Sequence, residues 1–419
     1  MKEARVFTAI RIVALVIVGV LRSRPVIFGT AAMVACLASV PLAVPSASAA
    51  APSDGTSRLV GWAGSTVPPK DDDVALRAAL EAVVDAGATG AIGLIDADAN
   101  VSATAVGVAR LDPSRPLRVS DQVRAGSVTK TVIATILLQL VAEGRLMLDD
   151  TVEQWLPNMV PNGAAITIRI LLNHTSGIFD YTADPDWNAA LLADPYRHWS
   201  PQELVAVGTA HPPLFPPGQG LAYSNTGYIL IGLVLENATG QPVQDLVWQR
   251  VILPLRLQDT FFATSARFRG AYAHGYFPPS LTGDGYLDTS SWHPSLAWTA
   301  GALVSTAPDL ARFYQALLSG RLLSPALLNE MTRTVTSPDY PGIGLGLGIW
   351  SVETPCGMAW GHLGGIPGYK SFALSNRGGT RSAVVIVPTE PDEAIGAAFE
   401  AAVATAVCQM SDRDQLAAS

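Results

Sequence analysis

The sequence predicts an α+β protein in which strands from both ends of the chain form one antiparallel sheet flanked by helices, while the middle folds as a mainly helical lobe. Alternation of apolar and polar residues, which is typical of half-buried strands, occurs at 91–111 and returns at 345–387. Between them, 150–340 shows helical runs among long loops rich in proline, glycine and aromatic residues. Strands from the two ends can share one sheet, and helices must then cover its apolar faces.

Residues 1–49 have the features of a secretion signal. They contain five basic residues and one acidic residue, an apolar stretch at Val26–Val44, and then Ala47-Ser48-Ala49, which suits signal peptidase. A retained membrane anchor is the alternative, because Val26–Val44 is just long enough to span a bilayer, but the prolines and small residues at its end favour cleavage. We therefore expect a secreted protein, cleaved after about Ala49, with residues 50–419 as a single unit.

Composition argues against several functions. The 419 residues include 27 Lys or Arg and 35 Asp or Glu, a net charge of −8 that becomes −12 without residues 1–49. An acidic chain argues against a nucleic-acid partner. The six histidines lack the spacing of metal ligands and there is no phosphate-binding loop, so we expect neither a metal nor a cofactor. His174, in a turn-like Asn-His-Thr-Ser-Gly, is expected to be structural.

A helix, a hairpin and a second helix are predicted before residue 150. Three acidic residues begin the first helix at Asp71, which runs to about Asp85. Ala91–Asp96 and Ala103–Leu111 are predicted as strands joined by a polar turn. Val128–Glu143 is the most helical stretch and is apolar on most faces, so it belongs in a core, where a polar group in its first turn is costly to bury.

Helices are predicted in the middle of the chain, and strands followed by a closing helix near its C-terminus. The predicted helices are Gln202–Thr209, Tyr228–Ala238, Leu310–Leu318 and Glu393–Cys408, and the predicted strands are Leu345–Glu353, Met358–His362, Tyr369–Asn376 and Arg381–Val387. No strand ladder is predicted in 150–340. These elements place an α/β lobe at about 70–150 and 340–410 and a mainly helical lobe at about 151–339.

Two cysteines remain once the leader, which contains Cys36, is removed. In an oxidising compartment the simplest prediction is a disulfide between Cys356 and Cys408, which would close a loop of about 50 residues and stabilise the fold by roughly 4 kcal/mol through its effect on the unfolded chain. The alternative is two free buried thiols.

Lys130 stands out because residues 50–419 contain three lysines against nineteen arginines, and this one falls in the first turn of the apolar helix. Burial and the positive helix end both disfavour its charged form, and a neutral lysine can act as a base. Ser127 lies one turn earlier on the same face, where it can lose a proton and attack as a nucleophile. The structural alternative has Ser127 as an N-cap and Lys130 extending to the surface.

Two further motifs could carry chemistry. Tyr223-Ser224-Asn225 follows a Pro-Pro-Gly turn and precedes an apolar helix, which can direct a phenol and an amide into a cleft, although a turn tyrosine is the simpler interpretation. Gly361-His362-Leu363-Gly364-Gly365 ends a predicted strand, and its glycines allow a backbone N–H to approach a ligand closely. A lone histidine at such a place is more often structural than catalytic.

In the order Ser-x-x-Lys, Tyr-x-Asn and His-x-Gly, these motifs form the signature of the penicillin-interacting serine hydrolases. The chain resembles the secreted soluble D-alanyl-D-alanine carboxypeptidases of that group and, more distantly, class C β-lactamases, over essentially the whole mature region. Connecting segments such as Leu172-Asn173-His174-Thr175-Ser176-Gly177, and both cysteines, extend the resemblance. It implies a β-lactamase/DD-peptidase-like fold, with an antiparallel five-stranded sheet flanked by helices, an all-helical lobe and a cleft between them.

The resemblance also implies a role for each motif residue. Ser127 would be the acylated nucleophile, and Lys130 would accept its proton or hold the network that does. Tyr223 would pass the proton to the leaving amine, and Asn225 would bond the substrate's amide. His362 would donate a hydrogen bond to the tyrosine or the substrate.

The walls of the implied cleft come from several segments. Backbone N–H groups of Ser127 and Gly365 would form the oxyanion hole, a contribution usually worth about 3 kcal/mol per donor. Leu363 and Gly364 would contact the substrate beside it. Aromatic walls are expected from Trp187 and Trp298, although both can equally be core residues.

The resemblance is weakest where the carboxypeptidases bind the terminal carboxylate of their substrate. They use an arginine after the Gly-Leu-Gly-Leu run and hydroxyls beside the third motif, whereas this chain has Trp350 and Leu363 there. A carboxylate needs a charge-assisted partner when it leaves water. Lys370 could supply one from another direction, but a surface lysine on a strand is the simpler interpretation.

Three functions therefore compete. The first is a D-alanyl-D-alanine carboxypeptidase that acts on peptidoglycan stem peptides and is acylated by penicillins and other β-lactams. The second is a D-aminopeptidase, amidase or esterase that acts on small D-amino-acid peptides or esters through the same acyl-enzyme. The third is a penicillin-binding wall protein without turnover, which the complete set of motif residues argues against. We expect the first, in a monomer.

Overall fold

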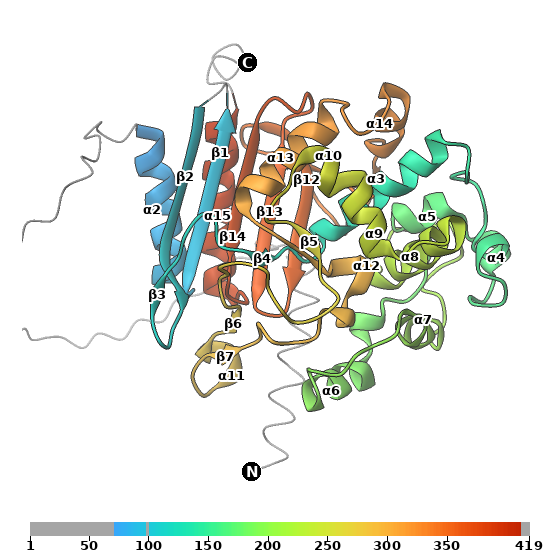
Figure 1. Cartoon of the computed structure of the whole chain (residues 1–419), viewed down its shortest axis with the longest axis horizontal. Coiled ribbons are helices and arrows are strands. Elements are labelled where there is room, and N and C mark those ends of the chain that lie inside the picture. The colour runs from blue at the N-terminus through green and yellow to red at the C-terminus, as the bar shows by residue number, and fades with distance from the viewer. Residues whose placement is uncertain (1–70, 98–99, 412–419) are drawn as a thin grey trace, which may run out of the picture. The chain divides into compact units, whose positions relative to one another are not determined.

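The computed structural model describes residues 71–97 and 100–411, which form one large antiparallel sheet with helices against it (Figure 1). The predicted secretion signal lies outside the described residues. The sheet has the strand order β3-β2-β1-β14-β13-β12-β11-β10-β9. Its strands are β1 (Gly90–Ala97), β2 (Asn100–Arg110), β3 (Arg115–Pro116), β9 (Val335–Thr336), β10 (Ile343–Leu345), β11 (Trp350–Thr354), β12 (Gly357–Ile366), β13 (Tyr369–Ser375) and β14 (Ser382–Val387).

Both ends of the chain contribute to this sheet, as predicted. β1 pairs antiparallel with β14, with Ile92 opposite Ile386, so the N-terminal hairpin continues the C-terminal strands. The α+β class is thereby confirmed. The sheet is wider than the five strands that we expected, mainly because β3, β9 and β10, of two or three residues each, extend its edges. Strands of two or three residues are too short to show the alternation of apolar and polar residues from which a strand is predicted.

Helices cover both faces of the sheet. α2 (Asp71–Asp85) and α15 (Glu393–Met410) pack together on one face, and α3 (Val128–Ala142) and α13 (Ala307–Leu318) lie on the other. All six residues of β14 are buried, with Val385 facing α2 and α15 and Val384 facing the opposite side. Successive residues of a strand point to opposite faces, so a strand covered on both sides is apolar throughout.

The middle of the chain is mainly helical, as expected. Its helices are α4 (Val152–Trp155), α5 (Ile168–Leu172), α6 (Pro185–Ala193), α7 (Pro201–Thr209), α8 (Asn225–Thr239), α9 (Val243–Val247), α10 (Leu253–Leu255), α11 (Pro279–Thr282), α12 (Trp298–Gly301) and α14 (Pro325–Met331). α3 contacts α8 and α12 as well as β12, so its apolar faces join the helical part to the sheet. α13 comes from this part of the chain but packs on β13 and β14.

Short strands that the sequence did not predict occur in the same region and, in one case, just before α3. They are β4 (Val123–Arg124), β5 (Phe261–Phe262), β6 (Tyr276–Phe277), β7 (Leu287–Asp288) and β8 (Leu303–Ser305). β4, β8 and β5 form a small sheet in which Ala125, just before the first motif, also bonds to the carbonyl of Leu303. This sheet fixes the segment that leads into α3.

The predicted strand Leu345–Glu353 is interrupted by a turn, so that β10 ends and β11 begins within it. Gly348 in this turn has a φ of +74°, and a Cβ at that position would lie 2.5 Å from the Cβ of Ala134 and 3.0 Å from the carbonyl oxygen of Lys130. The turn therefore packs against α3 so closely that it requires glycine.

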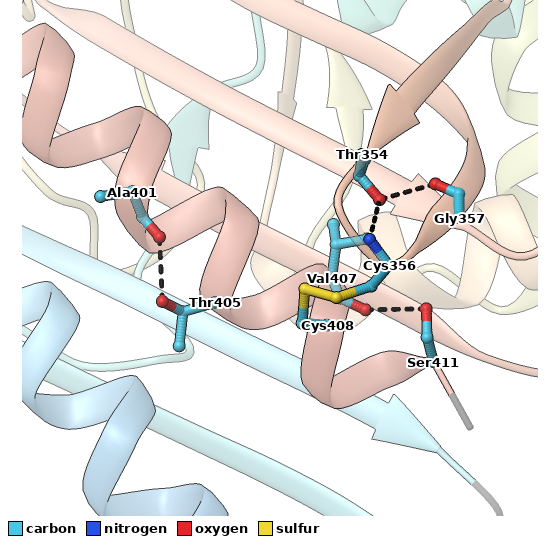
Figure 2. Close-up of a disulfide and its surroundings, with 8 residues drawn as sticks. All are labelled: Thr354, Cys356, Gly357, Ala401, Thr405, Val407, Cys408 and Ser411. Atoms are coloured by element: carbon cyan, nitrogen blue, oxygen red, sulfur yellow. Dashed lines mark hydrogen bonds between the residues drawn. A yellow bond between two sulfur atoms is a disulfide. The ribbon is translucent and has the colours of Figure 1, made fainter. Parts of the chain in front are cut away.

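A disulfide joins Cys356 and Cys408, as predicted (Figure 2). Cys356 lies in the turn between β11 and β12, and Cys408 lies near the end of α15. The Thr354 hydroxyl accepts the N–H of Cys356 and donates to the carbonyl of Gly357, which holds this turn in place. Among the described residues, no helix combines the length and apolarity needed to cross a bilayer.

Candidate active site

Ser127 lies at the N-terminal end of α3, where its hydroxyl makes no capping bond to the helix. Ser127 thus occupies the N-cap position without acting as a side-chain cap. Gly126 before it has a φ of +54°, a conformation that favours glycine. A Cβ at Gly126 would lie 2.7 Å from both the backbone nitrogen and the carbonyl oxygen of Gly365 on β12. Glycine at this position thus brings together the backbones of Ser127 and Gly365, the two expected oxyanion-hole residues.

The Lys130 side chain is fully buried and bonds to three acceptors. Its Nζ lies 3.0 Å from Oγ of Ser127, 2.7 Å from Oδ1 of Asn225 and 2.7 Å from the carbonyl oxygen of Ala300. The complete burial overturns the alternative in which Lys130 extends to the surface. Residues from the first two motifs, 95 positions apart, thus meet at one nitrogen atom.

Burial lowers the pKa of Lys130 from 10.5 to about 7, and the nearby Asp180 carboxylate partly opposes this effect. A neutral amine has two N–H groups and one lone pair. The carbonyl oxygens of Ala300 and Asn225 can only accept, so they hold the two N–H groups and leave the lone pair directed at the Ser127 hydroxyl. This geometry suits a general base that activates a serine nucleophile.

Asp180 belongs to the same network, although no motif or spacing in the sequence indicates it. Its buried carboxylate accepts hydrogen bonds from Nδ2 of Asn225 at 2.9 Å and from the N–H of Thr182 at 3.1 Å. Burial raises the pKa of Asp180. Nδ2 of Asn225 also donates to Oγ1 of Thr182 at 3.2 Å. Both N–H groups of Asn225 are therefore engaged, and the bond expected with a substrate amide is open only at the second lone pair of Oδ1.

Tyr223 lies over Lys130, with Nζ 4.9 Å from the centre of its ring. Burial raises the pKa of the Tyr223 phenol far above its usual value, and an interaction with Ser127 partly opposes this effect. The phenol is thus protonated at neutral pH, which suits a proton relay better than an initial base. His174 holds it in place, because its ring stacks on Tyr223 at 4.3 Å and its Nδ1 accepts the N–H of Ser224 at 3.1 Å.

His362 does not make the hydrogen bond expected of it. Its Nδ1 donates to the carbonyl oxygen of Leu363 at 2.5 Å, while its Nε2 is buried without a partner. Burial lowers the pKa of His362 to about 3, so the ring is neutral and its proton is on Nδ1. Nε2 can then only accept, which corrects the predicted role of His362 as a donor to Tyr223 or to the substrate.

A pocket of about 100 Å³ opens in front of Ser127, between the end of β12 and the helical part of the chain. Its walls are mostly apolar, with Leu191, Phe277 and Leu296 among the residues that line it. Trp187 lines it as expected, whereas Trp298 does not. The Trp298 ring instead packs against α8, where a Cβ at Gly232 would lie 2.7 Å from it.

The strand that carries the third motif contributes unequally to the pocket. Leu363 and Gly365 line it, but Gly364 does not, because it packs against the backbone of Ala125. Trp350, which was not predicted as a wall, supplies a second aromatic surface. Lys370 also lines the pocket, which corrects its interpretation as a surface lysine.

A serine activated by a buried lysine beside two backbone N–H groups is the arrangement of an acyl-transfer site. The family model described as Beta-lactamase matches residues 76–406. This chain belongs to the beta-lactamase family. Its fold is the β-lactamase/DD-peptidase-like fold that the motifs implied, and within the family it is a penicillin-interacting serine hydrolase.

Several beta-lactamase-family proteins are similar to it. The D-stereospecific amidohydrolase from Streptomyces sp. is 40% identical, with a TM-score of 0.72 and coverage of 78% of this chain and 98% of that one. The D-amino acid amidase from Ochrobactrum anthropi SV3, solved with L-phenylalanine amide, is 29% identical, with a TM-score of 0.71 and coverage of 81% and 98%. A penicillin-binding protein from Bacillus subtilis (strain 168) is 29% identical over 64% of this chain and 61% of its own length.

No group of three or more His, Cys, Asp or Glu side chains that could hold a metal ion occurs in residues 71–97 and 100–411.

Proposed function

We propose that this protein hydrolyses amide bonds of small D-amino-acid amides or peptides through an acyl-enzyme on Ser127. The observation that carries the proposal is Lys130, whose pKa is about 7 and whose Nζ lies 3.0 Å from the hydroxyl of Ser127, which itself lines a mostly apolar pocket. The amide bond and the D configuration are taken from the names of two structural neighbours, which cover 78% and 81% of this chain.

In acylation, Oγ of Ser127 transfers its proton to Nζ of Lys130 and bonds to the substrate's carbonyl carbon. The N–H groups of Ser127 and Gly365 stabilise the resulting oxyanion, by about 3 kcal/mol per donor. Among the described residues the Ser127 N–H has no backbone acceptor, so it is available for this bond. The C–N bond then breaks, and the leaving amine takes the phenolic proton of Tyr223. The proton that Lys130 took from Ser127 then returns Tyr223 to its neutral form.

In deacylation the same groups act in reverse. A water molecule bonds to the ester carbon and loses a proton to Lys130, the C–O bond to Ser127 breaks, and Oγ recovers its proton. The side chain of the acyl group would occupy the pocket lined by Trp187, Leu191 and Phe277. Full burial of a leucine- or phenylalanine-sized side chain contributes roughly 1.5–3 kcal/mol, so apolar D-amino acids are the expected acyl donors.

A D-alanyl-D-alanine carboxypeptidase that acts on peptidoglycan stem peptides is the second candidate. It needs a cation for the terminal carboxylate, and the presence of Lys370 in the pocket favours it. Secretion, expected from residues 1–49, suits this role, and the disulfide is compatible with an oxidising compartment. Because a penicillin presents a reactive amide and a carboxylate, acylation by β-lactams is expected with either substrate.

The test is to incubate the purified protein with a labelled penicillin and with D- and L-phenylalanine amide. We expect one label on the peptide that contains Ser127 and release of ammonia from the D enantiomer. Ser127→Ala should abolish both, while Ser265→Ala, which alters an exposed serine outside the pocket, should change neither. Labelling that survives Ser127→Ala would refute the assignment of the nucleophile.

A further inference from the structure

We propose that Lys370 is the anion-binding group of this pocket, and that the preferred substrates therefore carry a carboxylate, as a peptide with a free C-terminus does. This inference rests on the proposed acyl-enzyme function of the same site. It makes Lys370 a specificity-determining residue, which takes the place of the arginine and hydroxyls that the sequence lacks.

Lys370 lies beside the expected oxyanion hole. It is on β13, directly opposite Gly365 of β12, and side chains of directly opposite residues project from the same face of a sheet. The Lys370 Nζ is 3.7 Å from the position that a Cβ of Gly365 would occupy. Gly365 is exposed and has no side chain, so nothing at this position separates the ammonium group from the pocket that both residues line.

Within the described chain, this ammonium forms neither an ion pair nor a hydrogen bond. Lys370 donates no hydrogen bond and has no carboxylate oxygen within 4.0 Å among the described residues. Its other cross-strand neighbour, on β14, is Val387. The acids that act on it from a distance are Glu390 and the exposed Glu400 of α15, and Glu390 is buried with its Oε2 bonded to the N–H of Gly368 at 3.2 Å.

The rest of the pocket offers no alternative cation. Lys130 lies behind the lining and is bonded to Ser127, Asn225 and the carbonyl oxygen of Ala300. Asp180, which with Lys370 makes up the charged residues of the lining, is bonded to Asn225 and Thr182. Among the pocket residues, Lys370 is thus the cation that remains open to a ligand.

Burial lowers the pKa of Lys370, and the carboxylates of Glu390 and Glu400 only partly oppose this effect. An apolar side chain of the same length would fill this space without that cost. A carboxylate next to Nζ would supply a charge-assisted hydrogen bond, which is roughly twice as strong as a neutral one. A bound carboxylate would therefore compensate the part of the burial cost that Glu390 and Glu400 leave uncompensated.

The test compares two substrates that differ only in this charge, N-acetyl-D-phenylalanyl-D-alanine and its C-terminal amide. The wild-type protein should prefer the acid in kcat/KM. Lys370→Met should lower kcat/KM for the acid on the order of 10- to 100-fold, leave that for the amide within about twofold, and so remove the preference. Lys370→Arg should retain it, and Arg333→Met, which removes an exposed cation outside the pocket, should have no effect.

The ratio of kcat/KM for the acid to kcat/KM for the amide is measured within each variant, so a general loss of folded protein does not change it. Equal losses for acid and amide in Lys370→Met, or a wild-type protein that does not distinguish them, would overturn the role of Lys370 while leaving the proposed function intact. Hydrolysis of neither peptide, together with no acylation of Ser127, would overturn the proposed function and this inference with it.

Discussion

The state of Lys130 should determine the pH dependence of acylation. Because the pKa of Lys130 is about 7 and the neutral amine is the base, the acylation rate should be close to its maximum at pH 8 and about tenfold lower at pH 6. The sign follows from the chemistry, since protonation removes the lone pair that faces Ser127. The assay is the burst of p-nitrophenol from an N-acetyl-D-phenylalanine p-nitrophenyl ester, which has no group that titrates in this range. Because the released p-nitrophenol does titrate there, it is read at the wavelength at which the phenol and its anion absorb equally.

A substitution at Asp180 separates Lys130 from other groups that titrate nearby. Removal of this negative charge should lower the pKa of Lys130 further, since the carboxylate favours the ammonium form. The Asn225 side chain lies between the Asp180 carboxylate and Nζ of Lys130. At that separation a unit negative charge stabilises the ammonium form of Lys130 by on the order of 2 kcal/mol at an effective dielectric constant of 20. Asp180→Asn should therefore move the acid limb of the pH–rate profile, where the acylation rate falls, to lower pH. The acylation rate at pH 5, relative to its maximum, should rise by tenfold or more.

Glu390 is the necessary control, because burial raises its pKa to about 7 as well. It lies outside the lining of the pocket, so Glu390→Gln should leave the acid limb where it is. An acid limb that moves with Glu390→Gln and not with Asp180→Asn would show that Lys130 is not the base. Lys130→Arg is a further check, since an arginine keeps its proton, and it should lower acylation 10²- to 10⁴-fold at every pH.

Three further substitutions test the oxyanion hole, the disulfide and the pocket for the acyl side chain. Gly126→Ala should reduce acylation much more than thermal stability, because its Cβ would press on the backbone of Gly365, and an unchanged acylation rate would contradict the proposed oxyanion hole. Replacement of Cys356 and Cys408 by serine should lower the free energy of unfolding by about 4 kcal/mol, as measured by denaturant titration, and leave acylation of the folded protein unaltered. Leu191→Phe should narrow the pocket and lower kcat/KM for D-phenylalanine amide on the order of tenfold relative to D-alanine amide, whereas an unchanged ratio would place the acyl side chain elsewhere.

The elements with strong periodicity could be predicted from the sequence. α2 coincides with the prediction, α3 ends one residue before it, and α15 extends two residues beyond it. In these segments local propensity and burial agree. The prediction failed where tertiary contact decides the backbone, as at Gly348, where the alternating pattern of Leu345–Glu353 continues through a turn that α3 imposes.

The residues of the site likewise differ in whether the local sequence or the tertiary structure brings them together. Ser127 and Lys130 are one helical turn apart, so their proximity follows from local geometry alone. Asp180 reaches Asn225 across 45 residues of chain, and a single aspartate in a loop has no spacing that could reveal this. Lys370 lies on a strand whose pattern does not tell which face meets the pocket, and only the pairing of β12 with β13 decides it.

The use of lysine and arginine in this chain follows from their different chemistry. Arginines form most of the ion pairs of the described residues, as between Arg250 and Glu143 or between Arg115 and Asp121, whereas neither Lys130 nor Lys370 forms one. Arginine keeps its charge in every environment, which suits a permanent structural pair, while lysine loses its proton when burial is not compensated. Lys130 uses that property to exchange a proton with Ser127. Lys370 would instead act in its protonated form, because a bound carboxylate would stabilise the ammonium charge that burial disfavours. The carboxylate of the substrate and the ammonium of Lys370 would then each provide the charged hydrogen-bond partner that the other needs on leaving water.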